Sequence, residues 1–435
     1  MAYIRPAIAR FMKKAKRIEA QAGAAAAKYP PYLYTLFYAF SLYLVLPLID
    51  VPLLGLSISA PLFFIIAATV FFRPVKQWFN EYRGLIILSL TIWLAVAFST
   101  IINEMLPGAS FNRSGMVSIV QYAYWLLTFV VCAYLFSDQL VQKKVVNFFA
   151  YGILILSILR WVEAVVFDRI GAWSNTQFMS QNGYGFQFSI FFPFLIYKVF
   201  DPKTNRKGWW VVGVVVALGA IAINGSRGSW VSVALGMLLL LVAFFIIQPK
   251  TAVKGFLVLF VVTTIGALVL VVSPRLNSAV ISRFETLQTL DEDKSYVVRK
   301  VLVQKGLKLF AESPVIGVGS LRFTQEKTSL ELPDILSGAN IEYIERKESH
   351  NSYIQFLAEF GLLGSIPFVL LILSLLINSF IKVQKTMKSG SYLPIVITIS
   401  FIQMLTHMWV INALTSTLFW AMLGLNAGMS KEEND

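Results

Sequence analysis

Long apolar segments, separated mostly by short polar connections, constrain this chain more than any other feature. Twelve segments are candidates for membrane crossing: 33–48, 55–72, 84–102, 117–136, 145–167, 184–200, 209–223, 230–248, 255–273, 353–380, 393–411 and 414–428. Hydrophobic residues make up 57% of the chain and charged residues 14%, whereas soluble domains have about 45–50% and about 25%. Because a crossing helix needs roughly 20 mostly apolar residues, we predict an all-α polytopic membrane protein with about 12 transmembrane helices.

Lysine and arginine residues divide the connections into two alternating sets. One set consists of 1–32, 73–83, 137–144, 201–208, 249–254, 381–392 and 429–435, and it holds 22 of the 37 basic residues when Lys198 is assigned to it. The short connections of the other set hold only Arg113, Arg169 and Arg227. Basic loops stay in the cytoplasm, so we predict that both termini are cytoplasmic. The net charge of +14 follows this distribution, and we expect no nucleic-acid partner.

The N-terminal segment and one late connection complete the predicted organisation. Segment 1–32 is basic and has no apolar signal-peptide core, so it is predicted to form an amphipathic helix on the cytoplasmic membrane surface. Spans one to nine occupy 33–273, a large periplasmic loop occupies 274–352, the last three spans occupy 353–428, and 429–435 is a tail. Within the loop, residues 295–311 have apolar side chains spaced for one face of a helix, which the Glu312-Ser-Pro sequence ends.

Two residues near the predicted outer surface have side chains suited to chemistry. His350 precedes Asn351 at the outer mouth of the span that begins near 353, and histidine is the usual general base near neutral pH. The alternative is a structural position in which Ser349 or Asn351 caps the helix. Arg227 lies between two glycines in a tight outer turn, where its guanidinium group could bind phosphate or extend toward lipid headgroups.

Other charged residues have both functional and structural explanations. An anionic ligand would explain why Arg275, Arg299 and Arg322 gather in the outer loop, and ordinary solvated charge is the alternative. Arg160 and Glu163 share one face of the fifth span. They could belong to a functional cavity within the membrane, or they could form a structural ion pair.

The remaining polar groups give weaker signals. Glu359 is predicted to be buried and paired with a polar group, and His407 to bond to a neighbouring helix. Asp291-Glu-Asp293 is a weak candidate for a metal site, so no metal is predicted. The sequence has no Walker A or GxGxxG motif, which argues against ATP-driven transport and dinucleotide chemistry.

Taken together, three of these stretches resemble the O-antigen ligase and O-antigen polymerase superfamily. They are Gly-Ser-Arg-Gly-Ser-Trp at 225–230, Arg299 followed by Glu-Ser-Pro-Val-Ile-Gly-Val-Gly at 312–319, and His-Asn-Ser-Tyr-Ile-Gln-Phe-Leu-Ala-Glu-Phe-Gly-Leu-Leu-Gly at 350–364. Their order and their placement before, within and after the long outer loop also match. The last motif is fairly specific and the others less so. Arg169-Ile-Gly171 and Ser180-Gln-Asn-Gly183 match the family pattern loosely.

The resemblance implies a function and roles for particular residues. Such enzymes have a fold similar to the membrane part of GT-C glycosyltransferases and act at the periplasmic face of the bacterial inner membrane. They transfer a glycan from undecaprenyl pyrophosphate to an acceptor, with inversion and without metal or nucleotide cofactors. By this resemblance Arg227 and Arg299 would bind pyrophosphate and His350 would be catalytic.

The resemblance leaves the acceptor and some partners open. The acceptor is a second lipid-linked repeat in polymerases and lipid A core in ligases, and relatives glycosylate proteins. We lean toward a polymerase in assembly of O-antigen, lipopolysaccharide, capsule or exopolysaccharide. Partners would be the lipid-linked donor, the glycan acceptor, membrane lipids and, for a polymerase, a chain-length regulator protein. A flippase or other transporter is the alternative function, although its polar residues would be expected near the bilayer midplane.

Overall fold

A computed structural model of the 435-residue chain describes most of the predicted helical segments. The described residues are 31–46, 66–69, 75–106, 111–167, 169, 179–247, 249, 250, 253, 255–257, 260, 261, 264, 274–329, 332–386 and 392–429. Within them all regular secondary structure is helical. The predicted N-terminal amphipathic helix and most of the predicted spans 55–72 and 255–273 lie outside these residues.

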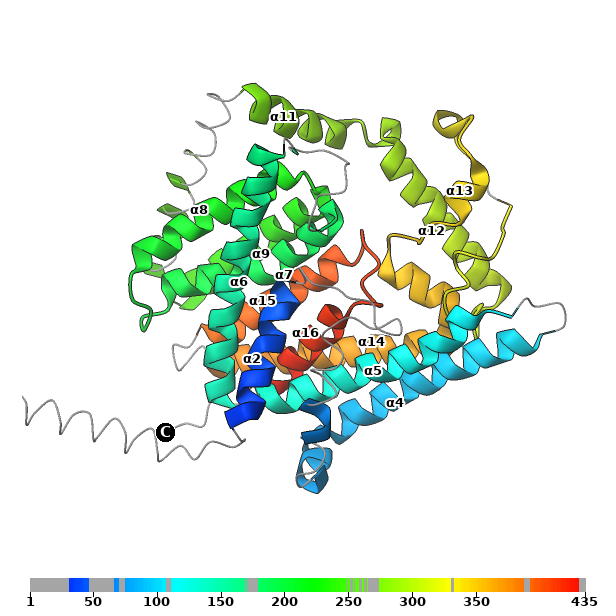
Figure 1. The fold of residues 1–435 in the computed structure, drawn as a ribbon, viewed down its shortest axis with the longest axis horizontal. Coiled ribbons are helices and arrows are strands. Elements are labelled where there is room, and N and C mark those ends of the chain that lie inside the picture. The colour runs from blue at the N-terminus through cyan, green and yellow to red at the C-terminus, as the bar shows by residue number, and fades with distance from the viewer. Residues whose placement is uncertain are drawn as a thin grey trace, which may run out of the picture.

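The apolar helices form one bundle, shown in Figure 1. They are α2 (Pro31–Val45), α4 (Val75–Met105), α5 (Arg113–Phe136), α6 (Gln139–Val166), α7 (Gln181–Phe200), α8 (Lys207–Asn224), α9 (Arg227–Ile247), α14 (Ser352–Thr386), α15 (Leu393–His407) and α16 (Thr417–Gly428). Six helices among the described residues are long and apolar enough to cross a membrane: Tyr82–Met105, Arg113–Phe136, Gln139–Val166, Lys207–Asn224, Arg227–Ile247 and Ser352–Lys385. The prediction of a polytopic all-α membrane protein is therefore confirmed, whereas the number of spans and the GT-C relationship stay predictions.

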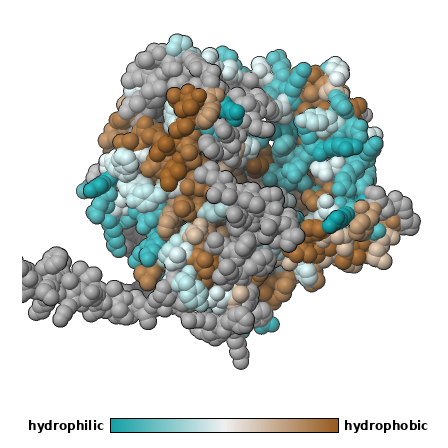
Figure 2. Space-filling view, viewed as in Figure 1, coloured by the Kyte–Doolittle hydropathy of each residue, from teal (hydrophilic) through white to brown (hydrophobic). Residues whose placement is uncertain are grey.

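The outer surface of the bundle is apolar where helices lack protein neighbours. On α6, for example, Ile155, Ile158 and Val165 are exposed at helical spacing, while Ile153 and Leu156 are buried. An apolar side chain is stable at such a position when lipid surrounds it. Figure 2 shows hydrophobic side chains over the visible parts of α4 and α5 and hydrophilic ones over the end of the molecule that holds α12 and α13.

Small residues bring α16 against α5. Gly424 and Gly428 are four residues apart, and a Cβ atom at either position would collide with the α5 backbone at Phe129 or Ala133. Helices in membranes pack closely where small residues recur at this spacing, because backbones approach and dispersion contacts increase. This contact fixes the C-terminal helix in the bundle.

The segment before α14 forms a small second core at one end of the bundle. It contains α11 (Pro274–Gln288), η1 (Leu290–Glu292), α12 (Lys294–Glu312), η2 (Asp334–Leu336) and α13 (Ile341–Glu345). The predicted amphipathic helix at 295–311 is confirmed, since α12 ends at Glu312 and buries Val301, Leu302 and Leu309. Figure 1 shows α11 and α12 along one edge of the molecule, with α13 beside α12.

Helix α14 is broken, and the break connects the second core to the bundle. Gly361 has φ 55° and ψ −157°, so the helix consists of residues 352–360 and 362–386. The amides of Val318 and Gly319 donate to the carbonyls of Ala358 and Glu359 at 3.0 and 2.9 Å. These bonds give partners to groups that a broken helix leaves unpaired.

The other side of the break is paired in the same way. The amides of Leu362 and Leu363 donate to the carbonyls of Pro314 and Val315, each at 2.9 Å. A Cβ atom at Gly361 would lie 2.5 Å from the Val315 oxygen, so a larger residue does not fit. The two family-like stretches, 312–319 and 350–364, are therefore hydrogen-bonded to each other.

Candidate functional site

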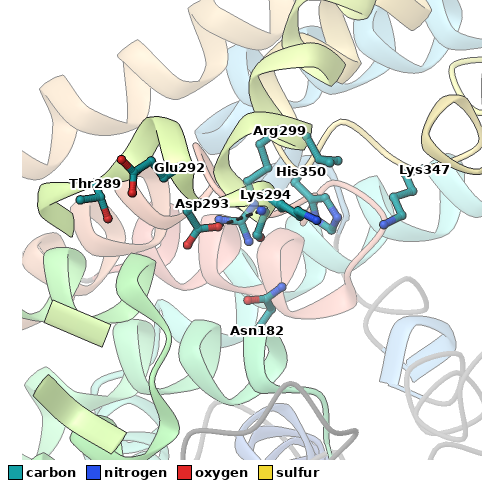
Figure 3. A pocket seen from close by; sticks show the side chains of 10 residues that line it. Asn182, Thr289, Glu292, Asp293, Lys294, Arg299, Lys347 and His350 are labelled. Atoms are coloured by element: carbon teal, nitrogen blue, oxygen red, sulfur yellow. Dashed lines mark hydrogen bonds between the residues drawn. The ribbon is translucent and has the colours of Figure 1, made fainter. Parts of the chain in front are cut away.

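A cavity of about 670 Å³ lies where the second core meets the bundle. Three parts of the chain line it: the start of α7, the region from the end of α11 through the first two turns of α12, and the connection before α14. The lining residues are Asn182, Thr289, Glu292, Asp293, Lys294, Ser295, Val298, Arg299, Lys347 and His350. Figure 3 shows Arg299 and His350 next to each other, with Asn182 facing them from α7 and Lys347 on the far side of His350.

Arg227 is the first residue of α9 and contacts the start of α12. Its Nη1 lies 2.8 Å from Oδ2 of Asp293. The same aspartate caps α12, since Oδ1 accepts hydrogen bonds from the amides of Ser295 and Tyr296 at 2.8 and 3.1 Å. Burial raises the pKa of Asp293, but the amide bonds and Arg227 outweigh it and hold the pKa below its usual range. Asp293 therefore stays anionic and connects the two helices.

Arg299 extends from α12 and lines the cavity. Among the described residues its guanidinium group has no hydrogen bond or ion pair, although it is partly buried. Burial and the nearby Arg227 lower its pKa, while Asp293 raises it. The two guanidinium groups are close enough to influence each other, and the site is partly buried. Such a site attracts an anion strongly.

The backbone around His350 is tightly held. Ser349 is fully buried, and its Oγ donates to the carbonyl of Asn351 at 2.6 Å. Asn351 caps α14 by accepting from the amides of Tyr353 and Ile354, each at 3.1 Å. The amide of Ser352 donates to the carbonyl of Met408 at 3.0 Å. His350 itself has φ 50°, and it lines the cavity.

The surroundings of His350 keep its imidazole neutral. Burial, then the charges of Arg299 and Lys347, lower its pKa to about 4. A neutral imidazole has one nitrogen that can accept a proton or hydrogen bond. The predicted helix cap is confirmed for Asn351, and the His350 side chain lines the cavity.

Of the other predicted site residues, Arg160 and Glu163 are buried, and Arg160 bonds to the backbone of Arg169. Arg160 lies 3.8 Å from Glu163, and its Nη2 donates to the carbonyls of Arg169 and Ile223 at 2.8 and 3.2 Å. Its Nε donates to Oδ1 of Asn224 at 3.3 Å. Arg160 is 1% exposed, so it supports the turn that precedes Arg227 and does not line the cavity.

Arg322 and Glu359 also have structural partners. Arg322 lies 2.9 Å from Glu104 on α4 and 3.2 Å from Glu326, which places its charge in an ion-pair network outside the cavity. Glu359 is buried, and Gln355 donates to it at 3.1 Å, as expected for a polar-paired residue. Arg275 lies on α11, and the orientation of its side chain is outside the described residues.

The cavity also contains residues that the sequence did not single out for its chemistry. Asn182 is the second residue of α7. The side-chain amides of the preceding Gln181 and of Asn224 each donate to the other residue's backbone carbonyl, at 2.7 and 3.0 Å. Lys347 lies three residues before His350. The sequence indicated Asp293 only as part of a weak candidate metal site at 291–293. Among the described residues no group of three or more His, Cys, Asp or Glu side chains is arranged to hold a metal ion.

Part of the chain is similar to a known protein family. A search of curated proteins found no match. Residues 212–369 match the family model described as O-antigen ligase. This range includes the turn at Arg227, all of α12, His350 and the break in α14. This match supports the resemblance of the chain to the O-antigen ligase and polymerase superfamily.

Proposed function

We propose that this protein transfers a glycan from a polyprenyl pyrophosphate carrier to an acceptor hydroxyl group during surface-polysaccharide assembly. The observation that carries the proposal is the cavity in which unpaired Arg299 and neutral His350 lie together, with Arg227 paired to Asp293 of the cavity lining. Its volume falls in the range of about 300–1,000 Å³ typical of small-molecule sites.

The two arginines would bind the pyrophosphate. A planar guanidinium group offers paired donors that fit phosphate oxygens. Charge accumulates on the leaving pyrophosphate as its bond to the sugar breaks, and fixed cations at that point stabilise the transition state. Arg299 is available for this contact, whereas Arg227 must exchange its bond to Asp293 for one to the donor.

His350 would accept the proton of the attacking hydroxyl. In one displacement the acceptor oxygen bonds to the anomeric carbon and the carbon–oxygen bond to pyrophosphate breaks, with its electron pair leaving on the phosphate. The proton moves to the imidazole, and the anomeric configuration inverts. A base with a pKa near 4 is weak. The negative charge of the bound donor would offset the charge of Arg299, and the pKa of His350 would then rise.

The positions of these residues support chemistry at one membrane face. Arg227 starts α9, Asn182 lies in the first turn of α7, and His350 precedes α14 by two residues. All three are therefore at helix beginnings, at the end of the bundle that holds the cavity. A transporter would be expected to concentrate such groups near the bilayer midplane.

Matched arginine-to-lysine substitutions would test the proposal. Lysine keeps the charge but loses the paired donors, so Arg227→Lys and Arg299→Lys should each reduce transfer by about 10- to 100-fold, the value of one charged hydrogen bond. Arg113→Lys is the control, because Arg113 also begins a helix and is exposed outside the cavity.

The assay would use purified protein, a synthetic polyprenyl-pyrophosphate glycan and two acceptors supplied separately. Product formed with a second lipid-linked repeat would identify a polymerase, and product formed with lipid A core would identify a ligase. Full activity of both cavity variants would contradict the proposed phosphate contacts. Product with retained anomeric configuration would contradict the single displacement.

A further inference from the structure

A second polar cavity lies at the other end of α7. It has a volume of about 480 Å³ and is lined by Tyr151, Lys198, Lys203, Thr204, Asn205, Arg206, Trp209 and Trp210. Asn182 lines the first cavity and Lys198 the second. Sixteen residues of helix separate them, or about 24 Å at 1.5 Å per residue. The hydrocarbon core is about 30 Å thick, so the two cavities lie near opposite membrane surfaces.

Positive charge predominates in this second cavity. Lys198, Lys203 and Arg206 contribute three cations. The nearby carboxylate of Asp201 is already engaged by its own turn, since Oδ1 accepts from the amide of Lys203 at 3.1 Å and Oδ2 accepts from the hydroxyl of Thr204 at 3.0 Å. The site therefore suits an anion.

The start of α8 adds to this preference. Arg206 is the N-cap of α8, has φ 56° and makes no side-chain capping bond. The first backbone amides of a helix carry partial positive charge, and they stabilise a phosphate group nearby. The backbone and the side chains thus favour the same kind of ligand.

Aromatic and apolar side chains continue from the cavity along the bundle surface. The rings of Tyr151 and Trp210 are 5.0 Å apart, and Lys198 Nζ lies 5.5 Å from the Trp210 ring centre. Trp209 is 60% exposed, as is common for tryptophan at the headgroup level. From Tyr151 an exposed apolar stripe extends along α6 through Ile155, Ile158, Val162 and Val165.

We propose that this cavity is a binding site for the phosphate-bearing headgroup of an anionic phospholipid, whose acyl chains lie along the exposed stripe of α6. A soluble phosphate would use the cations but not the stripe, and a zwitterionic lipid would use the stripe but gain little from three cations. Only an anionic lipid uses both. This site is separate from the glycan-transfer cavity and does not depend on the function proposed for it.

Native mass spectrometry of the detergent-purified protein would test the site with phosphatidylglycerol and phosphatidylcholine of equal chain length. Lys203→Gln with Arg206→Asn removes two exposed cations, and asparagine tolerates the positive φ of position 206. With about 1 kcal/mol per cation near an anionic surface, phosphatidylglycerol binding should weaken roughly 30-fold. Phosphatidylcholine binding should not change.

The matched control is Lys143→Gln with Lys144→Gln, which removes two exposed lysines from the start of α6, outside the cavity. This variant should keep the preference of the parent. Equal loss in both double variants, or no loss in the Lys203 and Arg206 variant, would overturn the proposal. Displacement of the lipid by glycerol phosphate at equal concentration would show that the cavity binds a soluble anion instead.

Discussion

His350 adopts a backbone conformation that most side chains avoid. Its φ of 50° lies in the left-handed region, where histidine, asparagine and aspartate are more common than other non-glycine residues. Residues on both sides are buried and hydrogen-bonded, so the surrounding structure imposes this conformation. Strained backbone of this kind tends to occur at functional sites, where it fixes a side chain in a required direction.

The pH dependence of transfer should report this histidine. Because its pKa is lowered to about 4, the neutral imidazole persists at acid pH, and kcat/KM should stay constant from neutral pH to about pH 5. The acid limb of kcat should lie at higher pH, since bound pyrophosphate offsets the charge of Arg299 and raises the pKa of His350. Steady-state rates across a pH series would measure both limbs.

His350→Asn separates a proton acceptor from an orienting group. Asparagine accepts the positive φ and can hydrogen-bond, but it cannot accept the proton. A base predicts a rate loss on the order of 10²–10⁴-fold and loss of the acid limb. A variant that keeps most of the rate would show that His350 only orients the acceptor.

Asp293 should compete with the donor for Arg227. Asparagine caps helices about as well as aspartate but lacks the charge that pairs with Arg227 at 2.8 Å. Asp293→Asn should therefore bind inorganic pyrophosphate more tightly than the parent, by an amount measurable with calorimetry. Asp293→Ala also removes the cap, and it should lower the melting temperature where Asp293→Asn does not. Weaker pyrophosphate binding in Asp293→Asn would mean that the aspartate orients Arg227 productively.

At the level of single residues, the sequence identified candidate residues at the cavity better than the residues that hold them in place. Arg227, Arg299 and His350 were identifiable because histidine and outward arginines are rare in this chain and fall in family-like stretches. The cap-and-ion-pair role of Asp293 was not predictable, because it depends on α9 reaching the start of α12. Likewise, Arg160 and Arg322 are of a residue type that often binds anionic ligands. Only their burial and their partners in the structure show a structural role.

Among the helices, α14 differs most from its sequence pattern. The apolar run predicted one uninterrupted span at 353–380, whereas the structure has a break at Gly361. Hydropathy does not detect the break, because a glycine between apolar residues does not lower the mean hydropathy of the segment. The break is stable only because another segment supplies the missing hydrogen bonds. The partner is 314–319, which is more than 40 residues away in sequence and was predicted only as the end of a helix.

Gly361→Ala should destabilise the protein selectively. A Cβ atom there is strained by the φ of 55° and collides with Val315, so we expect a cost of about 1–3 kcal/mol and a lower melting temperature. The control is Gly84→Ala in α4, where an added Cβ meets nothing within 4 Å. That change should be neutral or stabilising by up to about 1 kcal/mol. Equal melting temperatures for the two variants would contradict the structural role of the break.

For the whole molecule, the distribution of basic residues predicts an orientation that labelling can test. Cysteine at Ser278, exposed on α11, should react with an impermeant thiol reagent in cells with a permeabilised outer envelope. Cysteine at Asn205, exposed between α7 and α8, should react only after the inner membrane is opened. The native Cys132 is buried and should remain silent. Reversed labelling would place both termini outside and contradict the predicted orientation.

The hydrogen bonds across the break in α14 also have a consequence for biosynthesis. Residues 314–319 leave the ribosome before α14 does. They must already be on the predicted periplasmic side of the membrane when α14 inserts. Until the two meet, four backbone groups at the break lack partners, and each such group costs several kcal/mol in lipid. We therefore expect α14 to reach its final arrangement only when residues 314–319 dock. His350 lies between the docked segments, so we expect its backbone position to be fixed only after this docking.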